Sequence, residues 1–433
     1  MSKSESEVPL EGQNEYIGRM TQQIFSHCFD NGLVLLAEPM DWLESAAFSI
    51  LLPAGCAYDP AEQLGLGNFL CEMTQRGAGN RSSRQFVEVL ENLGVDRASG
   101  VSNIHSSYAG AMPAENLTEA LEVHTDLLRR ATLPEEQMGE ALQVCLQEVR
   151  SVEDDLAQKV MQELRQLHYG DPWGRSCQGT EVSLATIDIQ DVRQQYERTY
   201  RPGGSIISIA GNIDWPHVLS TVERLLGDWQ PTTPTDPIER APRTGYQHIP
   251  HDSSQTHVAI AYDSVPYGHP DYFQARGAVG VLSDGMSSRL FTEVRERRGL
   301  CYTVYASMHS TRDRGSVMCY AGTSTDRAQE TLDVMLAELK RIADGIERAE
   351  LDRLKARVKS SLIMQQESSR GRSASMASDW YYLNRVQTLD ELSGIIDDLS
   401  CDTINKHLSE NPPREFTIVT LGEKELEVPV AVS

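Results

Sequence analysis

The chain carries the same succession of strands and helices twice, and this duplication restricts its fold more than any other feature. Between the two copies, residues 229–256 hold five prolines and little apolar periodicity, which is typical of a linker. A length of 433 residues with 40% hydrophobic side chains also favours two cores over one. We therefore predict an N-terminal extension (1–30), a first domain (31–228), the linker (229–256) and a second domain (257–433).

The first half opens with short β-rich runs and continues with helical periodicity. Alternating or continuous apolar residues bounded by Gly, Pro and Asn predict strands over 33–38, 46–52 and 205–210. Apolar residues three and four positions apart predict helices over 83–93, 115–130 and 134–167. These elements predict a mixed α+β domain.

The second half repeats this order. Strands are predicted over 257–262, 299–308, 316–323 and 416–421. Helices are predicted over 272–282, 326–345 and 348–366. Because the last strand occupies the place that 205–210 holds in the first half, we predict two copies of one α+β unit.

A short helical segment carries the first functional signal. In the inverzincin motif His-x-x-Glu-His, two histidines on one helix face bind zinc and the glutamate polarises the attacking water. Residues 64–79 read LGLGNFLCEMTQRGAG and place Asn68, Cys71 and Glu72 in those three positions. The residues around them match the pattern G-L-x-H-F-L-E-H-M at Gly65, Leu66, Phe69, Leu70 and Met73. In these positions the chain resembles the pitrilysin and mitochondrial-processing-peptidase family, with the chemical residues replaced.

Two further segments carry the same resemblance. Glu148 follows Glu72 by 76 positions, where that family has its third zinc ligand on a second helix. The segment LSDGMSSRLFTEVRERRGLCYTVYAS resembles the family's C-terminal signature, with Arg295 and Tyr302 in the places of its substrate-binding Arg and Tyr. The resemblance runs from about Gly32 to about Gly422 and implies two homologous α/β-sandwich domains that enclose a peptide chamber.

The altered motif has an ordinary structural interpretation as well. Asn68, Glu72 and Gln75 form the polar stripe that any amphipathic helix shows, and Glu148 alone is typical of a solvated carboxylate. A rebuilt metal site of Cys71, Glu72 and Glu148 lacks any imidazole, and Asn68 is a poor neutral ligand for zinc. We therefore expect no metal in this chain, while the spacing of Glu148 favours descent from a metallopeptidase.

Arg295 and Tyr302 are the candidate substrate-binding residues. In the family such a pair hydrogen-bonds a peptide carbonyl and stabilises the developing oxyanion. The alternative is that Arg295 is a solvated member of the basic run RERRG and that Tyr302 packs at the start of a strand. The neighbouring match at 286–290 and 299–300 favours the substrate-binding role.

The first half departs from the family at a second place. In VDRASGVSN the resemblance implies an edge strand whose Asn-Ala pair contacts the substrate backbone, and Arg97-Ala98 stands there instead. An arginine at this position narrows the space along the strand edge or adds a positive charge to it. The positions that depart from the family pattern therefore lie in the first half, and the matches to the substrate-binding signature lie in the second.

Composition excludes several other classes of protein. A net charge of −24 argues against nucleic-acid binding, which needs clustered Lys and Arg. Eight cysteines without a C-x-x-C pair indicate neither a structural zinc nor a disulfide framework. No run of about 18 apolar residues occurs, and the Glu-rich N-terminus resembles neither a signal nor a transit peptide. We expect a cytoplasmic location without a membrane span.

These observations predict a non-catalytic subunit of a zinc-dependent endopeptidase heterodimer. The resemblance implies a homologous partner that carries His-x-x-Glu-His and the zinc, while this chain contributes Arg295 and Tyr302 and binds a peptide or unfolded protein. Alone, the chain is expected to be inactive. Two alternatives remain open, namely a scaffold or peptide-binding homologue without a peptidase role, and an independently active hydrolase.

Overall fold

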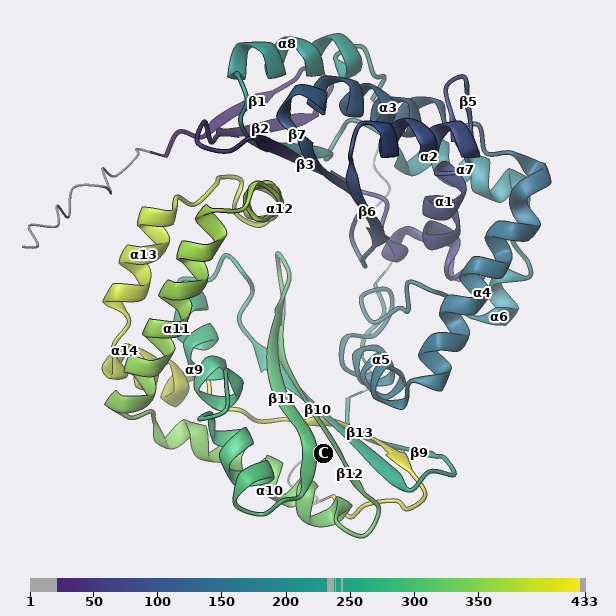
Figure 1. The fold of residues 1–433 in the computed structure, drawn as a ribbon. Helices are drawn as coiled ribbons and strands as arrows, with labels where there is room; N and C mark the ends of the chain where they lie inside the picture. The colour runs from purple at the N-terminus through teal and green to yellow at the C-terminus, as the bar shows by residue number, and fades with distance from the viewer. Residues whose placement is uncertain (1–21, 232–236, 238, 243, 429–433) are drawn as a thin grey trace, which may run out of the picture.

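A computed structural model describes residues 22–231, 237, 239–242 and 244–428 and shows two mixed α/β domains that face each other (Figure 1). The first sheet has six strands in the order β1-β2-β8-β3-β7-β6. Their bounds are Phe25–Cys28 (β1), Val34–Pro39 (β2), Ser45–Leu52 (β3), Asp96–Val101 (β6), Ser106–Pro113 (β7) and Ile206–Gly211 (β8). A separate two-stranded sheet joins β4 (Gly77–Ala78) to β5 (Arg81–Ser82). The α+β class predicted from the sequence is confirmed.

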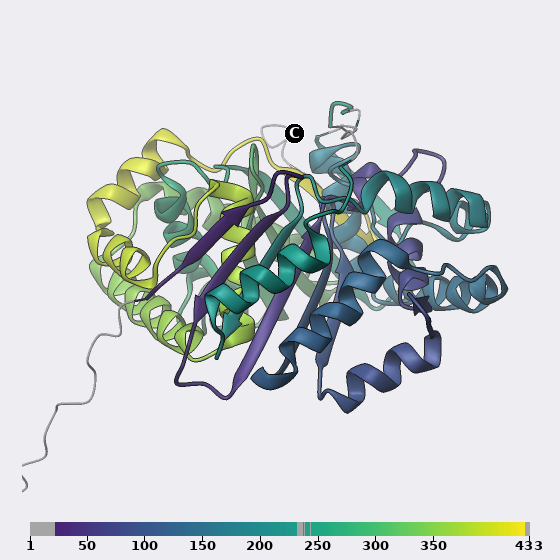
Figure 2. The same ribbon diagram turned by 90° about the horizontal axis from the view of Figure 1, so that it is seen from above.

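Helices cover the outer face of the first sheet. They are α1 (Leu66–Thr74), α2 (Ser83–Asn92), α3 (Leu117–Arg130), α4 (Met138–Asp154), α6 (Glu181–Leu184), α7 (Ile189–Thr199) and α8 (Trp215–Leu226). Seen from above, α8 and α3 lie across the strands (Figure 2). Apolar side chains from these helices, such as Leu121 and Val222, pack with Phe48 and Ile209 of the sheet in one core.

The second sheet has five strands in the order β11-β12-β10-β13-β9. Their bounds are Tyr246–Pro250 (β9), Gln255–Ser264 (β10), Cys301–Ser310 (β11), Gly315–Ser324 (β12) and Thr417–Gly422 (β13). Its outer helices are α9 (Tyr272–Ser283), α10 (Ala328–Arg341), α11 (Arg348–Gln366), α13 (Leu389–Asp398) and α14 (Cys401–Glu410). None of the helices in the described part of the chain has the length and apolar composition needed to cross a membrane.

The two halves exchange one helix each. From the first half, α5 (Leu156–Tyr169) packs Val160 and Leu164 against Ala259 and Val419 of the second sheet. From the second half, α12 (Ser369–Leu383) packs Met376 and Ala377 against Leu36, Ile206 and Ala210 of the first sheet. Each sheet is therefore covered on its inner face by the other half (Figure 1). This explains why all six residues of β8 are buried, because the strand has helices on both faces.

The prediction of a single helix over 134–167 is wrong. The structure has two helices, α4 and α5, that meet at Asp155, where φ is −93° and ψ is 93°. The Asp155 side chain accepts hydrogen bonds from the backbone N–H groups of Ala157 and Gln158, so it caps α5. Apolar spacing continues across this break, since each helix has its own buried stripe, and periodicity alone therefore does not reveal it.

The predicted extension and linker each contain a strand. Phe25–Cys28, inside the predicted extension 1–30, pairs antiparallel with β2 as β1. Tyr246–Pro250, inside the predicted linker 229–256, pairs parallel with β13 as β9. Both are short edge strands with polar residues, so their pairing depends on partners elsewhere in the chain. The remaining parts of these predictions at 1–21, 232–236, 238 and 243 lie outside the described residues.

Replacing Asp155 by alanine is expected to lower the free energy of unfolding by about 1 kcal/mol, the usual value of a helix N-cap. Hydrogen bonds from the Gln158 side chain hold the pKa of Asp155 below its usual value. The stability that the Asp155 cap contributes is therefore present at neutral pH, and it disappears as the pH falls through this lowered pKa. Urea denaturation at neutral pH and near pH 3 measures both effects. Asp154→Ala removes the same charge without the cap, and an equal loss in that control would contradict the capping role.

Candidate functional site

The helix of the altered zinc motif, α1, begins at a rigid turn. Gly65 has φ +90°, and a Cβ there would lie 2.6 Å from the carbonyl oxygen of Gln178, so only glycine fits. The buried carboxylate of Asp59 accepts hydrogen bonds from the N–H groups of Gly65 (3.0 Å) and Gly67 (2.8 Å). These contacts set the position of α1 against the rest of the domain.

Two arginines, Arg175 and Arg198, lie near Asp59. Burial raises the pKa of Asp59 to about 7, against the hydrogen bonds from Gly67 and Gly65 and the charges of Arg175 and Arg198, which lower it. Arg175 also donates to the carbonyl oxygen of Asp59 (2.7 Å). No local sequence signal marks Asp59, because its partners come from α1, α7 and the loop after α5.

The structure brings Asn68 and Glu148 together. The Asn68 side-chain amide donates a hydrogen bond of 2.6 Å to the Glu148 carboxylate, which joins α1 to α4. Glu72 pairs instead with Arg76 at 2.8 Å, and Arg76 also contacts Glu140 at 3.2 Å. The sequence prediction did not include Arg76, although its position four residues after Glu72, in the turn that follows α1, is a usable signal.

Cys71, in the position of the catalytic glutamate, points into the core and is 4% exposed. Burial raises the pKa of the Cys71 thiol to about 11, so the thiol stays protonated at neutral pH. A protonated thiol neither activates water nor binds zinc well. Cys71 therefore acts as a small apolar side chain in the first core.

These residues do not fit the zinc ion that the motif would hold. The Asn68 amide nitrogen is a hydrogen-bond donor, the Glu72 carboxylate is held by Arg76, and the Cys71 thiol is protonated. In the described ranges, no group of three or more His, Cys, Asp or Glu side chains is arranged to hold a metal ion. The residues at this motif therefore provide no zinc centre.

Because Glu148 already faces α1, two substitutions are expected to restore a zinc site. Asn68→His and Glu72→His together provide two imidazoles beside the Glu148 carboxylate, the ligand set of a catalytic zinc centre. The expected result is one tightly bound zinc per folded chain, measured by metal analysis after dialysis. Adding Glu148→Gln is the control and should weaken binding by more than about 10-fold. A folded double variant without zinc would show that Glu148 is not in the ligand position.

In the second half, Arg295 lies between two aromatic rings. It belongs to a π-helical segment (Phe291–Glu296), and its guanidinium carbon lies 4.7 Å from the ring centres of both Phe291 and Tyr302. The Tyr302 side chain, at the start of β11, is 81% exposed. Within the described residues, no carboxylate pairs with Arg295. Phe291 was not predicted, although it lies four positions before Arg295 on one helix.

The two groups of residues lie on opposite domains. Asn68 and Glu148 belong to the first domain, Arg295 and Tyr302 to the second, and the described side chains show no hydrogen bond or ion pair between them. Each domain presents an edge strand, β6 in the first sheet and β11 in the second. On β6, Arg97 donates to the Gln75 side chain at 3.0 Å, which directs its charge toward the end of α1.

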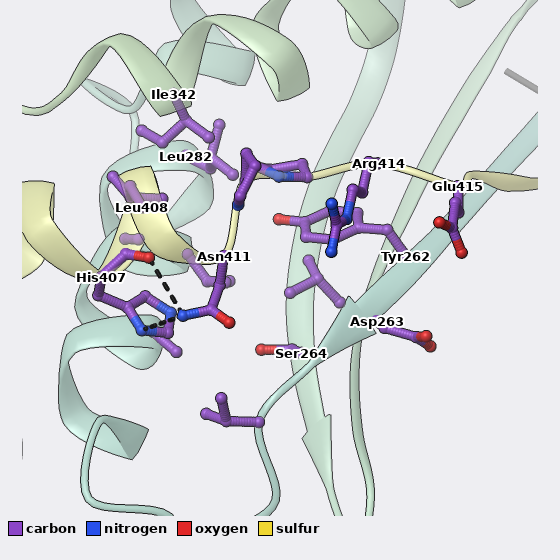
Figure 3. A pocket seen from close by; sticks show the side chains of 17 residues that line it. Tyr262, Asp263, Ser264, Leu282, Ile342, His407, Leu408, Asn411, Arg414 and Glu415 are labelled. Carbon is purple, nitrogen blue, oxygen red and sulfur yellow. Dashed lines mark hydrogen bonds between the residues drawn. The ribbon is translucent and has the colours of Figure 1, made fainter. Parts of the chain in front are cut away.

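A cavity of about 190 Å³ lies elsewhere in the second domain, between the end of β10 and α14 (Figure 3). There Asn411 donates to the carbonyl oxygen of His407 at 3.3 Å, and His407 lies 3.6 Å from Asp271. This cavity includes neither the altered zinc motif nor Arg295 and Tyr302. It is therefore not part of the candidate site.

Comparisons with known proteins identify the family. A protein-family model described as insulinase (peptidase family M16) matches residues 39–181. A second family model, described as peptidase M16 inactive domain, matches residues 186–358. An uncharacterized zinc protease of Bacillus subtilis is 28% identical over 381 residues, which cover 87% of this chain and 92% of that protein. One of Rickettsia felis is 24% identical over 376 residues, which cover 86% of this chain and 91% of that protein.

Solved structures show the same fold. A peptidase M16 inactive domain from Pseudomonas fluorescens superposes with a TM-score of 0.84 at 20% identity, covering 94% of this chain and 99% of that one. A protease from Helicobacter pylori superposes with a TM-score of 0.85 at 18% identity, covering 92% and 99%. The chain belongs to the M16 peptidase family, that of pitrilysin and the mitochondrial processing peptidase, as a member without the His-x-x-Glu-His zinc motif.

Proposed function

We propose that the chain is the non-catalytic subunit of a cytoplasmic zinc-dependent endopeptidase heterodimer, in which Arg295 and Tyr302 bind the peptide. A homologous partner supplies His-x-x-Glu-His, the zinc and the activated water. The observation that carries this proposal is the stacking of Arg295 between Phe291 and the exposed Tyr302. It contrasts with the altered zinc motif, whose polar groups are bonded to one another.

The stacked arginine is suited to bind an oxygen acceptor. The two rings restrict the Arg295 guanidinium before any peptide binds. The side chain therefore loses little conformational entropy when its N–H groups donate to a peptide carbonyl. In the described part of the chain no acidic side chain competes for those donors. A partner subunit that covers this surface would exclude water and strengthen the hydrogen bonds to a developing oxyanion.

The state of the first domain supports a division of labour between two chains. Without an imidazole at Asn68 or Glu72 and with a protonated thiol at Cys71, the motif on α1 has no group that activates water. Its fold nevertheless keeps α1, α4 and both sheets of the family. A chain that retains the fold and a substrate-binding pair, but not the zinc ligands, is suited to complete a chamber around a substrate cleaved by its partner.

An extended peptide is the class of substrate that the sheet edges favour. The backbone of β6 pairs with β7 on one side only, so its other edge offers N–H and C=O groups to a further strand. Arg370 of α12 closes one end of this edge by an ion pair with Asp96 at 2.7 Å. Peptide binding by main-chain hydrogen bonds tolerates many sequences, as an unfolded protein substrate requires.

The test is to isolate the tagged chain from its native cells and to identify the protein recovered in equal amount, with a zinc count on the complex. We expect a homologue that carries His-x-x-Glu-His, with one zinc per pair. A second preparation with the tag at the opposite terminus controls for a tag that blocks assembly. Recovery of the chain alone and free of zinc in both preparations would overturn the heterodimer and leave a scaffold or peptide-binding role.

A further inference from the structure

Two cysteines far apart in the sequence lie on neighbouring segments beside the N-terminus of α1. Cys56 is in the short turn Cys56–Tyr58 after β3, and its sulfur lies 4.0 Å from the carbonyl oxygen of Arg175. Cys177 follows Arg175 by two residues in the loop between α5 and α6. The Cys56 sulfur therefore lies against the segment that carries Cys177, two residues before that cysteine.

The loop that carries Cys177 is held on both sides of this residue. Before it, the Arg175 side chain donates to the carbonyl oxygens of Cys56 (3.4 Å) and Asp59 (2.7 Å) and pairs with Asp171. After it, Gly179 lies so close to the chain that a Cβ there would be 2.2 Å from the carbonyl oxygen of Leu64. These contacts hold the loop of Cys177 against the segment of Cys56 without any covalent bond.

The two cysteines differ in access to solvent. Cys56 is fully buried, whereas Cys177 is half-buried, so an oxidant in solution reaches Cys177 first. Interaction with the Cys177 thiol raises the pKa of the Cys56 thiol well above its usual value, and burial adds to the rise. Because it is more accessible, Cys177 is the residue that attacks a small disulfide, and the buried Cys56 is the residue that resolves the product.

We propose that Cys56 and Cys177 form a reversible disulfide when the chain meets a low-molecular-weight disulfide such as oxidised glutathione. The Cys177 thiolate attacks one sulfur of the small disulfide and releases one thiol, leaving a mixed disulfide on Cys177. The Cys56 sulfur, after losing its proton to water, attacks the Cys177 sulfur and releases the second thiol. The two protein thiols are oxidised and the small disulfide is reduced to two thiols.

The bond would act on the helix of the altered zinc motif. The side chain of Asp59, three residues after Cys56, accepts hydrogen bonds at the start of α1, and the loop of Cys177 contacts Gly65 at the same place. A covalent bond between these segments therefore restrains the N-terminus of α1 from two sides. It also closes a loop of about 120 residues, and closure of so long a loop lowers the entropy of the unfolded chain.

The experiment compares the full-length chain after incubation with oxidised glutathione and after dithiothreitol. The expected product has lost two hydrogens by intact mass, contains a cross-linked peptide pair with Cys56 and Cys177, and has a Tm raised by about 5 °C that dithiothreitol reverses. Cys177→Ser is expected to abolish all three effects, while Cys28→Ser, which removes an exposed cysteine on β1, should leave them unchanged.

Three results would overturn the disulfide. They are a wild-type chain that only gains glutathione, a peptide pair that joins other cysteines, and a two-hydrogen loss that persists in Cys177→Ser. If Cys177→Ser does not fold, peptide mapping of the wild-type chain decides alone, because it identifies the bonded residues directly. None of these results depends on a peptidase partner.

Discussion

Replacing Arg295 by alanine is expected to lower kcat of the assembled peptidase by about 100-fold, the usual effect of removing one donor to an oxyanion. The guanidinium that stacks on Phe291 and Tyr302 is the donor in our proposal, and alanine leaves both rings without their cation. If Arg295 also holds the bound peptide before reaction, KM rises as well. Steady-state kinetics of the reconstituted complex on a peptide substrate separates the two contributions.

Two further variants make this test specific. Tyr302→Phe keeps the ring against Arg295 but removes the hydroxyl group, so a decrease of about 10-fold is expected. Arg297→Ala is the matched control, because Arg297 pairs with Glu293 at 2.5 Å and should leave turnover unchanged. Size-exclusion chromatography checks that each variant still assembles. Unchanged turnover of an assembled Arg295→Ala complex would remove the substrate-binding role.

Replacing Arg372 by alanine is expected to lower the free energy of unfolding by about 3–5 kcal/mol, the usual cost of leaving a buried charge unpaired. Arg372 of α12 is 1% exposed and donates to the Glu38 carboxylate of β2 at 2.8 Å. The pair therefore joins the exchanged helix of the second half to the sheet of the first. Urea denaturation measures the loss.

Arg370→Ala provides the control for this second prediction. Arg370 also belongs to α12 and also crosses to the first half, where it pairs with Asp96, but the Arg370 side chain is 43% exposed and that of Asp96 is 77% exposed. An exposed pair contributes at most about 1 kcal/mol. Replacing both charges, by Arg372→Met with Glu38→Gln, should recover part of the stability, because neither charge remains buried. Equal losses from Arg370→Ala and Arg372→Ala would contradict the role of burial.

Much of the fold could be predicted because local patterns carry it. The apolar run at 205–210 predicted β8 within one residue, and the periodic segment at 348–366 predicted α11 with its bounds. By contrast, α12 escaped prediction. Its sequence, SRGRSASMASDWYYL, has small and polar residues without a clear apolar stripe, since it packs through Met376, Ala377 and an ion pair against another domain.

The candidate site divides in the same way. Spacing along the sequence related Asn68 and Glu72 to Glu148, and the structure places Asn68 against Glu148. Arg76 and Phe291 were within reach of prediction, because each lies four positions along the sequence from a predicted residue. Asp59 was not, because its burial and its nearness to Arg175 and Arg198 depend on segments that only the folded chain brings together.

The sequence by itself determined the family, the duplicated α+β architecture and the absence of the zinc histidines, because motifs and periodicities are properties of neighbouring residues. Only the tertiary structure decided which sheet each of α5 and α12 covers, that Glu72 is held by Arg76, and that the segments of Cys56 and Cys177 lie side by side. The physical reason is range. A helix or a metal motif is specified within a few turns, whereas contacts between distant segments depend on how two domains pack.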